Sequence, residues 1–290
     1  MNNGAPTMAS TTGSINVNLK RFDCRAAMSV KCNAVVIGKR NTGKSVVIAE
    51  LLYYLNKQKV PRACVFSATE ESNRFFCRHV PDSFIFDEKN VEGKLTEIVE
   101  QQKRLQLQKD IGEIDRDTDL RVVIVLDDMG YNRKALTSQI LTFIFMNGRH
   151  YDITLIVAIQ HVMQLTPALR SNTDYVICLK EGNKNVMRNL YENFFGVFEK
   201  PVHFKNAFDA CTKDFGCLIL NNTVTSVLVN DTVNWYKATP NREFKFGSKE
   251  FWEYHDERYV SIQDRYLLHN RPSADTTMSS DGTFVIHKHV

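Results

Sequence analysis

Long apolar runs, paired cysteines and a strong charge of one sign are all missing from this 290-residue sequence. It contains no stretch of about 18 apolar residues, so we expect no membrane-spanning segment. Residues 1–18 are mostly small and polar and lack the apolar core of a signal peptide. The seven cysteines form no CxxC pair, and none has a histidine at zinc-ligand spacing, which indicates free thiols in a reducing compartment.

The charge of the chain is nearly balanced. Lys and Arg total 37 and Asp and Glu total 33, which gives a formal net charge of +4. That excess is small for a protein that coats DNA by charge alone, so any nucleic-acid contact has to be local. Hydrophobic residues make up 43% and charged residues 24%, as in ordinary globular chains. A mostly disordered protein, a collagen-like fibre and a disulfide miniprotein are therefore excluded.

Short apolar segments alternate with amphipathic ones along the chain. We predict strands at 33–37, 63–67, 83–86, 121–126, 154–159 and 175–179, and helices at 43–57, 91–109, 133–147 and 185–195. Strands that alternate with helices indicate an α/β fold with a mostly parallel central sheet flanked by helices. Two further apolar segments, 217–220 and 224–229, flank Asn221 and Asn222 and predict a C-terminal β-hairpin.

The two ends of the chain differ in composition from the middle. Residues 1–20 are rich in Gly, Ser, Thr and Asn and are predicted to be a flexible leader. Residues 21–234 form the predicted ordered domain. Residues 235–290 form a C-terminal extension, rich in aromatic residues up to position 259 and linker-like, hence partly disordered, beyond. Its mixed aromatic and basic residues are compatible with nucleic-acid binding, but we favour packing of these aromatics onto the core.

A phosphate-binding loop follows the first predicted strand. Residues 38–45 match G-x-x-x-x-G-K-[ST], between an apolar strand and a helix, which is the context this motif requires. The backbone N–H groups of such a loop and the helix N-terminus bind phosphate oxygens. Lys44 is predicted to reach the β- and γ-phosphates, and the Ser45 hydroxyl to bind Mg²⁺. The predicted nucleotide-binding residues are Gly38, Lys39, Arg40, Asn41, Thr42, Gly43, Lys44, Ser45 and Val46.

Two adjacent carboxylates end the strand at 121–126. Asp127 and Asp128 are costly to place at the end of a buried strand unless a cation or water needs them, and ligands bind at the carboxyl ends of parallel strands. We therefore assign Asp127 to Mg²⁺ and Asp128 to the attacking water, as general base or orienting group. The alternative is that the pair caps the next helix or turns the chain.

The strand at 154–159 ends in a polar pair, Gln160 and His161. A side chain at this tip can reach the γ-phosphate and respond to its loss. Gln160 suits that role because its amide can donate to phosphate and accept from water. His161 is the rival candidate, although a surface histidine is the simpler interpretation.

Three arginines are candidates for charge stabilisation during hydrolysis. Gly148 fits a helix C-cap, so Arg149 is expected to project from a loop, where it can enter a neighbouring subunit's site. From spacing alone, an exposed residue or a helix-end ion pair is the simpler interpretation of Arg149. Arg170 is the second candidate, and Arg40 can contact phosphate within its own subunit.

Four elements in this order, GKRNTGKS, VVIVLDD, NGRH and TLIVAIQ, resemble the FtsK/HerA superfamily of P-loop motors. Within it, the short chain and the LDD ending are similar to the DNA-packaging ATPases of the nucleocytoplasmic large DNA viruses, the group that includes the poxvirus packaging protein. The resemblance covers roughly residues 30–230. Many members carry Asp-Glu where this chain has Asp127 and Asp128, which makes the role of Asp128 less secure than that of Asp127.

The resemblance implies an ASCE-type P-loop fold and ATP-driven translocation of double-stranded DNA into a viral capsid. It also implies a pentameric or hexameric ring of identical subunits and a capsid or portal-type partner. The place of action would be the viral factory in the host cytoplasm and the virion. Gln160 would be the sensor, and Arg149 the finger that acts on the adjacent subunit.

Two other functions remain open on the sequence. One is a P-loop enzyme of the nucleotide-kinase type, although no Arg-rich lid segment is present. The other is an ATP-gated capsid-assembly scaffold that does not hydrolyse ATP. A GTPase is disfavoured, because the segment at 183–186 lacks the aspartate of the base-reading motif.

Overall fold

The computed structural model describes residues 18–28, 31–87, 89–129 and 132–259. Most of the predicted leader, and the linker-like part of the C-terminal extension, lie outside the described residues. Within the described ranges, no helix combines the length and apolarity needed to cross a bilayer.

The core of the molecule is one mixed sheet of nine strands in the order β1-β9-β8-β7-β2-β6-β5-β3-β4. β8 runs antiparallel to both of its neighbours, and every other pair is parallel. The expected mostly parallel sheet is thereby confirmed. The strands are β1 (Lys20–Arg21), β2 (Asn33–Ile37), β3 (Arg62–Ser67), β4 (Ile85–Phe86), β5 (Val122–Asp127), β6 (Ile153–Ile159), β7 (Tyr175–Cys178), β8 (Gly216–Asn221) and β9 (Val233–Lys237).

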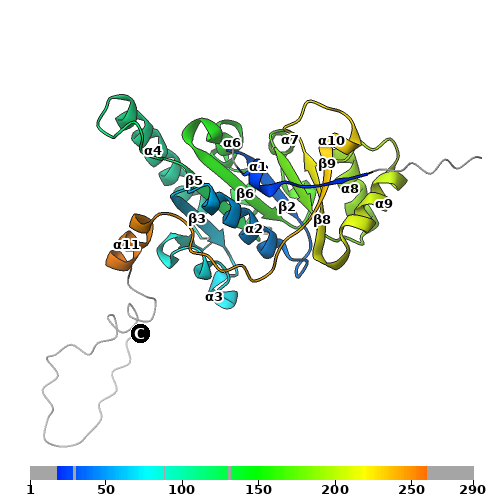
Figure 1. The fold of residues 1–290 in the computed structure, drawn as a ribbon, viewed down its shortest axis with the longest axis horizontal. Coiled ribbons are helices and arrows are strands. Elements are labelled where there is room, and N and C mark those ends of the chain that lie inside the picture. The colour runs from blue at the N-terminus through cyan, green and yellow to red at the C-terminus, as the bar shows by residue number, and fades with distance from the viewer. Residues whose placement is uncertain (1–17, 29–30, 88, 130–131, 260–290) are drawn as a thin grey trace, which may run out of the picture.

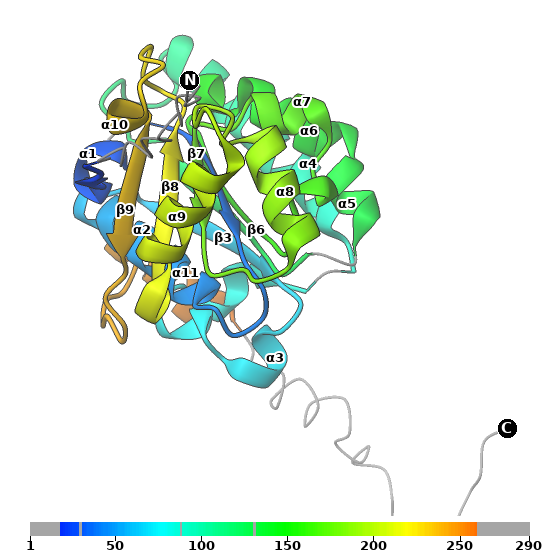
Figure 2. The same ribbon diagram turned by 90° about the vertical axis from the view of Figure 1, so that its right-hand side faces the viewer.

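Helices cover both faces of the sheet (Figures 1 and 2). They are α1 (Cys24–Ala27), α2 (Lys44–Lys57), α3 (Glu70–Asn73), α4 (Val91–Asp110), α5 (Arg133–Thr137), α6 (Gln139–Asn147), α7 (Pro167–Ser171), α8 (Lys184–Asn193), α9 (Pro201–Cys211), α10 (Val229–Thr232) and α11 (Lys249–Arg258). Alternate residues of each central strand join opposite cores, as the two-residue repeat of a strand requires. In β2, Val35 belongs to the core that includes residues of α4, α6 and α8, whereas Val36 belongs to the core that includes residues of α2.

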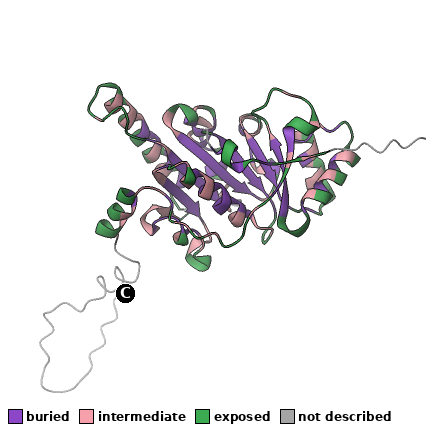
Figure 3. Cartoon of the chain, viewed as in Figure 1, coloured by how far each residue is buried: buried purple, intermediate pink, exposed green. Residues whose placement is uncertain are grey.

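Figure 3 shows that the central strands are buried and that exposure is confined to the outer faces of the helices and to the loops. This pattern explains why the strands read as continuous apolar runs rather than as alternating ones. β5 is buried at every position, including its final residue Asp127.

The predicted helix at 133–147 is in fact two helices, α5 and α6. Ser138 between them is extended (φ −67°, ψ 150°), and its hydroxyl accepts from Leu141 N–H at 3.3 Å, so a serine inside an apolar stretch acts as an N-cap. Gly148 lies at the C-cap of α6 but is right-handed (φ −53°). The chain continues as a 3-10 helix through Tyr151, so Arg149 lies in a helical turn and not in the expected loop.

The second strand of the predicted hairpin lies further along the chain than expected. β8 pairs with β9 rather than with residues 224–229. Asn222 lies in a turn and donates its amide to Thr173 O at 2.9 Å and its backbone N–H to Asp174 O at 2.8 Å, so the turn is tied to the start of β7. Val227 is 82% exposed, whereas Val233 is fully buried, so the strand that pairs with β8 lies at 233–237 and not at 224–229.

The C-terminal segment packs onto the core, as favoured from the sequence. β9 runs across the predicted boundary after residue 234. Residues 238–248, here called the strap, then cross the outer face of α2 to reach α11 (Figure 1). The strap is fixed by Arg242, which forms an ion pair with the buried Glu50 of α2, and Tyr236 O–H donates to the same carboxylate at 2.6 Å.

Candidate nucleotide site at the carboxyl edge of the sheet

The phosphate loop joins the end of β2 to the start of α2. Gly43 precedes the helix with φ 97°, a left-handed conformation that side chains disfavour, so a glycine is required there. The Lys44 ammonium lies inside the loop and donates to the carbonyls of Gly38 at 2.9 Å and Lys39 at 3.0 Å. Burial lowers the pKa of Lys44, and the carboxylates of Asp128 and Asp127 partly offset that effect. The loop thus holds a largely desolvated cation at its centre.

One loop residue is tied to the neighbouring strand. Lys39 Nζ lies 2.7 Å from Glu181 Oε1, a carboxylate that is 3% exposed and follows β7. The same oxygen accepts from the N–H groups of Gly182 and Asn183 at 2.7 Å each. Burial alone would raise the pKa of Glu181, but the hydrogen bonds from Lys39 and these amides bring the pKa below its usual value. Lys39 therefore braces the loop, a role that the sequence did not indicate.

The acidic pair lies beside the loop. Asp127 ends β5, and its Oδ2 lies 3.5 Å from Ser45 Oγ. Its other oxygen, Oδ1, is buried and has no hydrogen-bond partner among the described residues. Burial, reinforced by Asp128, raises the pKa of Asp127 to about 6. A buried carboxylate with an unused oxygen beside a serine hydroxyl fits Mg²⁺, which proteins bind through one or two carboxylates together with substrate phosphates.

Asp128 and Gln160 are in direct contact. Gln160 Nε2 donates to Asp128 Oδ1 at 2.8 Å, although the two residues come from different strand ends. Asp128 is left-handed (φ 50°), a conformation that aspartate tolerates, and this bends the chain away from β5. The capping alternative for the acidic pair is wrong, because Asn132 caps α5 through Ala135 N–H at 3.0 Å. His161 is exposed beside this pair.

Two of the three arginine candidates lie away from the loop. Arg149 Nη2 is 3.9 Å from Asp174 Oδ1, at the amino end of β7. β6 separates Arg149 from Gln160, and its seven residues at about 3.3 Å each span roughly 20 Å. Arg149 therefore lies at the opposite edge of the sheet from its own phosphate loop. Arg170 donates to Leu165 O at 2.6 Å within its own turn, whereas Arg40 is exposed on the loop.

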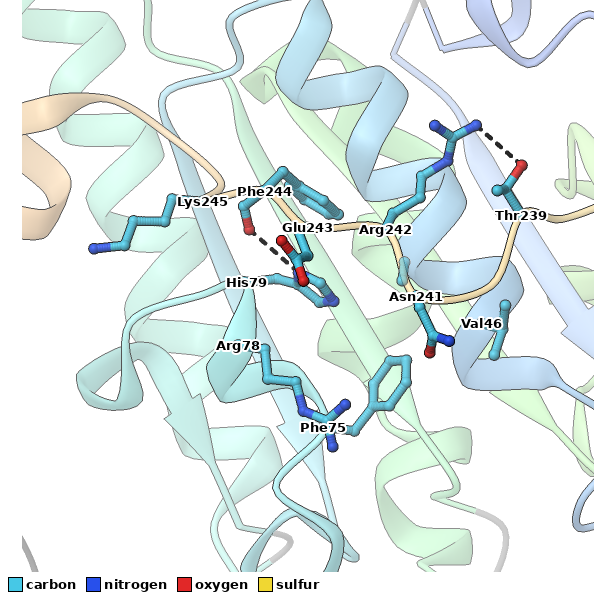
Figure 4. A pocket seen from close by; sticks show the side chains of 11 residues that line it. Val46, Phe75, Arg78, His79, Thr239, Asn241, Arg242, Glu243, Phe244 and Lys245 are labelled. Atoms are coloured by element: carbon cyan, nitrogen blue, oxygen red, sulfur yellow. Dashed lines mark hydrogen bonds between the residues drawn. The ribbon is translucent and has the colours of Figure 1, made fainter.

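Val46, in the first turn of α2, lines a cavity of about 740 Å³ between α2, the strap and the segment after α3 (Figure 4). Phe75 forms part of the opposite wall. Glu70, at the start of α3, contributes to the raised pKa of Asp127 and accepts from Phe76 N–H at 3.0 Å. Glu70 was not predicted as a site residue, although it comes shortly after β3, as Asp128 comes directly after β5. Among the described residues no cluster of three acidic, His or Cys side chains is placed to hold a metal.

Comparisons with known proteins agree with this geometry. A sequence model of the family described as "Poxvirus A32 protein" matches residues 19–226. An uncharacterized protein of Acanthamoeba polyphaga mimivirus is 31% identical over 251 residues, which cover 86% of this chain and 87% of that protein. An uncharacterized protein of Invertebrate iridescent virus 6 is 33% identical over 233 residues, 78% of this chain and 85% of that protein.

Solved structures show the same fold. The genome packaging NTPase B204 from Sulfolobus turreted icosahedral virus 2 in complex with sulfate aligns with a TM-score of 0.52 and 16% identity, over 73% of this chain and 98% of that one. The pCW3 conjugation coupling protein TcpA with ATPgS aligns with a TM-score of 0.51 and 13% identity, over 83% of this chain and 66% of that one. Together with the family match, these alignments confirm the P-loop fold and the predicted resemblance.

Proposed function

The chain belongs to the Poxvirus A32 protein family, and on that basis we propose that it is an ATPase of viral genome packaging. In finer terms, we propose that it hydrolyses ATP to translocate double-stranded viral DNA into a capsid. The observation that carries the proposal is the arrangement at one sheet edge: the phosphate loop, Asp127 next to Ser45, and Gln160 bonded to Asp128. A structure of B204 in complex with ATP-gammaS supports ATP as the nucleotide.

Each residue of the site has its own role in the proposed hydrolysis. Lys44, whose donors now point at loop carbonyls, would turn them to the β- and γ-phosphates. Ser45 and Asp127 would hold Mg²⁺, which supplies charge neutralisation at the phosphates when bound. Asp128 would accept the proton of the attacking water or orient it. Gln160 would report the state of the γ-phosphate through its hydrogen bond to Asp128.

Arg149 supports a multi-subunit mechanism. It lies at the opposite edge of the sheet from its own phosphate loop, and half of its side chain is exposed. Its weak contact with Asp174, at 3.9 Å, leaves the guanidinium able to bind elsewhere. We propose that it neutralises charge at the nucleotide of a neighbouring subunit in a homo-oligomeric ring, which acts with a capsid or portal-type partner in the host cytoplasm and the virion.

The test is ATP turnover with and without long double-stranded DNA, for wild type, Lys44→Ala and Arg149→Ala. A motor requires DNA-stimulated turnover that both variants lose. When Arg149→Ala is mixed into wild type, ATP turnover should fall by more than the fraction of variant subunits, because each variant subunit also inactivates the site of its neighbour. Arg104→Ala, an exposed arginine of α4, is the matched control and should be neutral.

The outcomes separate the alternatives. ATP binding without turnover would favour the capsid-assembly scaffold. Turnover that depends on a small phosphate acceptor instead of DNA would favour the kinase-type enzyme. Normal hydrolysis by Arg149→Ala would exclude Arg149 as the residue that acts on the neighbouring subunit. Full turnover by a strictly monomeric species would exclude a ring mechanism.

A further inference from the structure

We propose that the cavity beside Val46 binds the purine base and ribose of the nucleotide. Phe75 would stack on the base, and Asn241 of the strap would make the polar contact. This rests on the proposed function, because it extends the nucleotide from the phosphate loop. It adds what the loop motif cannot provide, namely which residues recognise the nucleoside.

The packing of α2 determines where a nucleoside can leave the loop. The inner face of the helix is closed against the sheet, with Val47, Ile48 and Leu51 all 3% exposed or less. A nucleotide whose phosphates meet the first N–H groups of α2 must therefore extend along the outer face of its first turn. Val46 is the residue of that turn that faces outward, and it lines the cavity.

The cavity has the size and lining of a nucleoside site. Its volume of about 740 Å³ falls within the range of small-molecule pockets, about 300–1,000 Å³. One wall is Phe75, which is half-buried and packs edge-on to Phe76 with ring centroids 5.1 Å apart. A base needs such a fixed aromatic face to stack on. Figure 4 shows Phe75 facing the cavity from the segment below the strap.

The opposite wall comes from the strap. Asn241 projects beside Val46 (Figure 4) and is left-handed, with φ 55°. Asparagine tolerates this conformation, and its amide offers a donor and an acceptor, the pattern that matches the edge of adenine. The next residue, Arg242, holds the strap through its ion pair with Glu50, so the polar wall is fixed to the helix that binds the phosphates.

Side chains of α3 hold the segment that carries Phe75. The Glu70 carboxylate accepts from the N–H groups of Phe76 and Cys77 at 3.0 and 2.9 Å. Asn73 Oδ1 accepts from Phe75 N–H at 3.1 Å. These hydrogen bonds fix the backbone at Phe75 and just after it, so the ring has a fixed support in the wall of the cavity.

The experiment compares ATP with inorganic tripolyphosphate, which has the phosphates without a base. Binding is measured by calorimetry for wild type, Phe75→Ala, Asn241→Ala and the control Tyr254→Ala, an exposed aromatic of α11. Loss of one stacking contact should weaken ATP binding about 5- to 150-fold, with tripolyphosphate binding unchanged. Asn241→Ala should weaken ATP binding about fivefold. Because Asn241 is exposed, its variant also tests the proposal should Phe75→Ala fail to fold.

Three results would overturn the assignment. The first is wild-type ATP affinity in folded Phe75→Ala and Asn241→Ala. The second is a parallel loss of ATP and tripolyphosphate binding. The third is a loss of ATP binding in Phe215→Ala instead, since this phenyl group is 68% exposed, lies within 3.6 Å of where a Cβ on Gly43 would be, and does not line the cavity. Failure of the proposed function is distinct: wild type would then bind neither ligand, or Lys44→Ala would bind both normally.

Discussion

Replacement of Asp127 by asparagine should make the metal-free protein more stable while abolishing its activity. The Asp127 carboxylate is 3% exposed, and one of its oxygens has no hydrogen-bond partner among the described residues. Burial, together with Asp128, raises its pKa from 3.8 to about 6. At neutral pH the folded protein therefore holds a charge that water would solvate better in the unfolded chain.

The size of the effect follows from the pKa. Each unit corresponds to about 1.4 kcal/mol, so a rise of roughly two units destabilises the fold by up to about 3 kcal/mol at neutral pH. Because a carboxyl group with a raised pKa favours the protonated form, this destabilisation is complete above pH about 6 and vanishes as the pH falls towards 3.8. Asparagine keeps the size of the side chain and its contact with Ser45 but carries no charge. We expect Asp127→Asn to gain about 1–3 kcal/mol at neutral pH and almost nothing near pH 4.

Thermal unfolding in a metal chelator, at neutral pH and near pH 4, measures this difference. A gain of about 2–4 °C per kcal/mol is expected for a domain of this size. Asp117→Asn, a change at an exposed aspartate, is the matched control and should be neutral. Adding Mg²⁺ and ATP should stabilise wild type and leave Asp127→Asn unchanged. A lower midpoint for Asp127→Asn at neutral pH, or an equal gain at both pH values, would refute the reasoning.

Three further outcomes follow from the structure. Gln160→Glu places a second carboxylate against Asp128, where the amide now donates at 2.8 Å, so phosphate release should slow at least about tenfold; unchanged turnover would contradict the assignment. Arg242→Met leaves the Glu50 carboxylate, 1% exposed, without its cation and should cost about 3–5 kcal/mol in urea unfolding, with partial recovery when Glu50→Gln is added. Burial raises the pKa of Cys64 to about 12, so mass spectrometry should find it unmodified by iodoacetamide near pH 8 until urea unfolds the chain.

Much of the fold could be predicted because its central strands are buried on both faces. Segments such as 121–126 and 154–159 then read as uninterrupted apolar runs, and their lengths and spacing leave little choice but a parallel sheet. Prediction failed where polar residues redirect the chain. Ser138 splits a helix by capping its second half. Asn222 lies in a turn that is tied to the start of β7, and the next strand forms only at β9. Both residues favour several local structures, so only tertiary contacts decide between them.

The sequence allowed us to predict which site residues lie close together at the carboxyl edge of the sheet. Asp127 ends β5, Gln160 directly follows β6, and Ser45 lies in α2 after the loop that follows β2. The carboxyl ends of parallel strands meet at one edge, so the proximity of these residues follows from topology. Their chemical roles stay predictions. The pairing of Lys39 with Glu181 had no comparable signal, because a lysine inside a phosphate loop is expected to face phosphate.

The proposed base cavity could not be predicted from sequence patterns, for a different reason. Val46, Phe75 and Asn241 come from three segments, and no motif connects them. One signal was nevertheless present: Glu50 interrupts the apolar pattern of α2 at a position that is 1% exposed. A buried carboxylate requires a cation or hydrogen-bond donors from elsewhere in the chain, and here Arg242 and Tyr236 supply them. The need of Glu50 for a partner therefore places the strap, and with it Asn241, over the first turns of the helix that binds the phosphates.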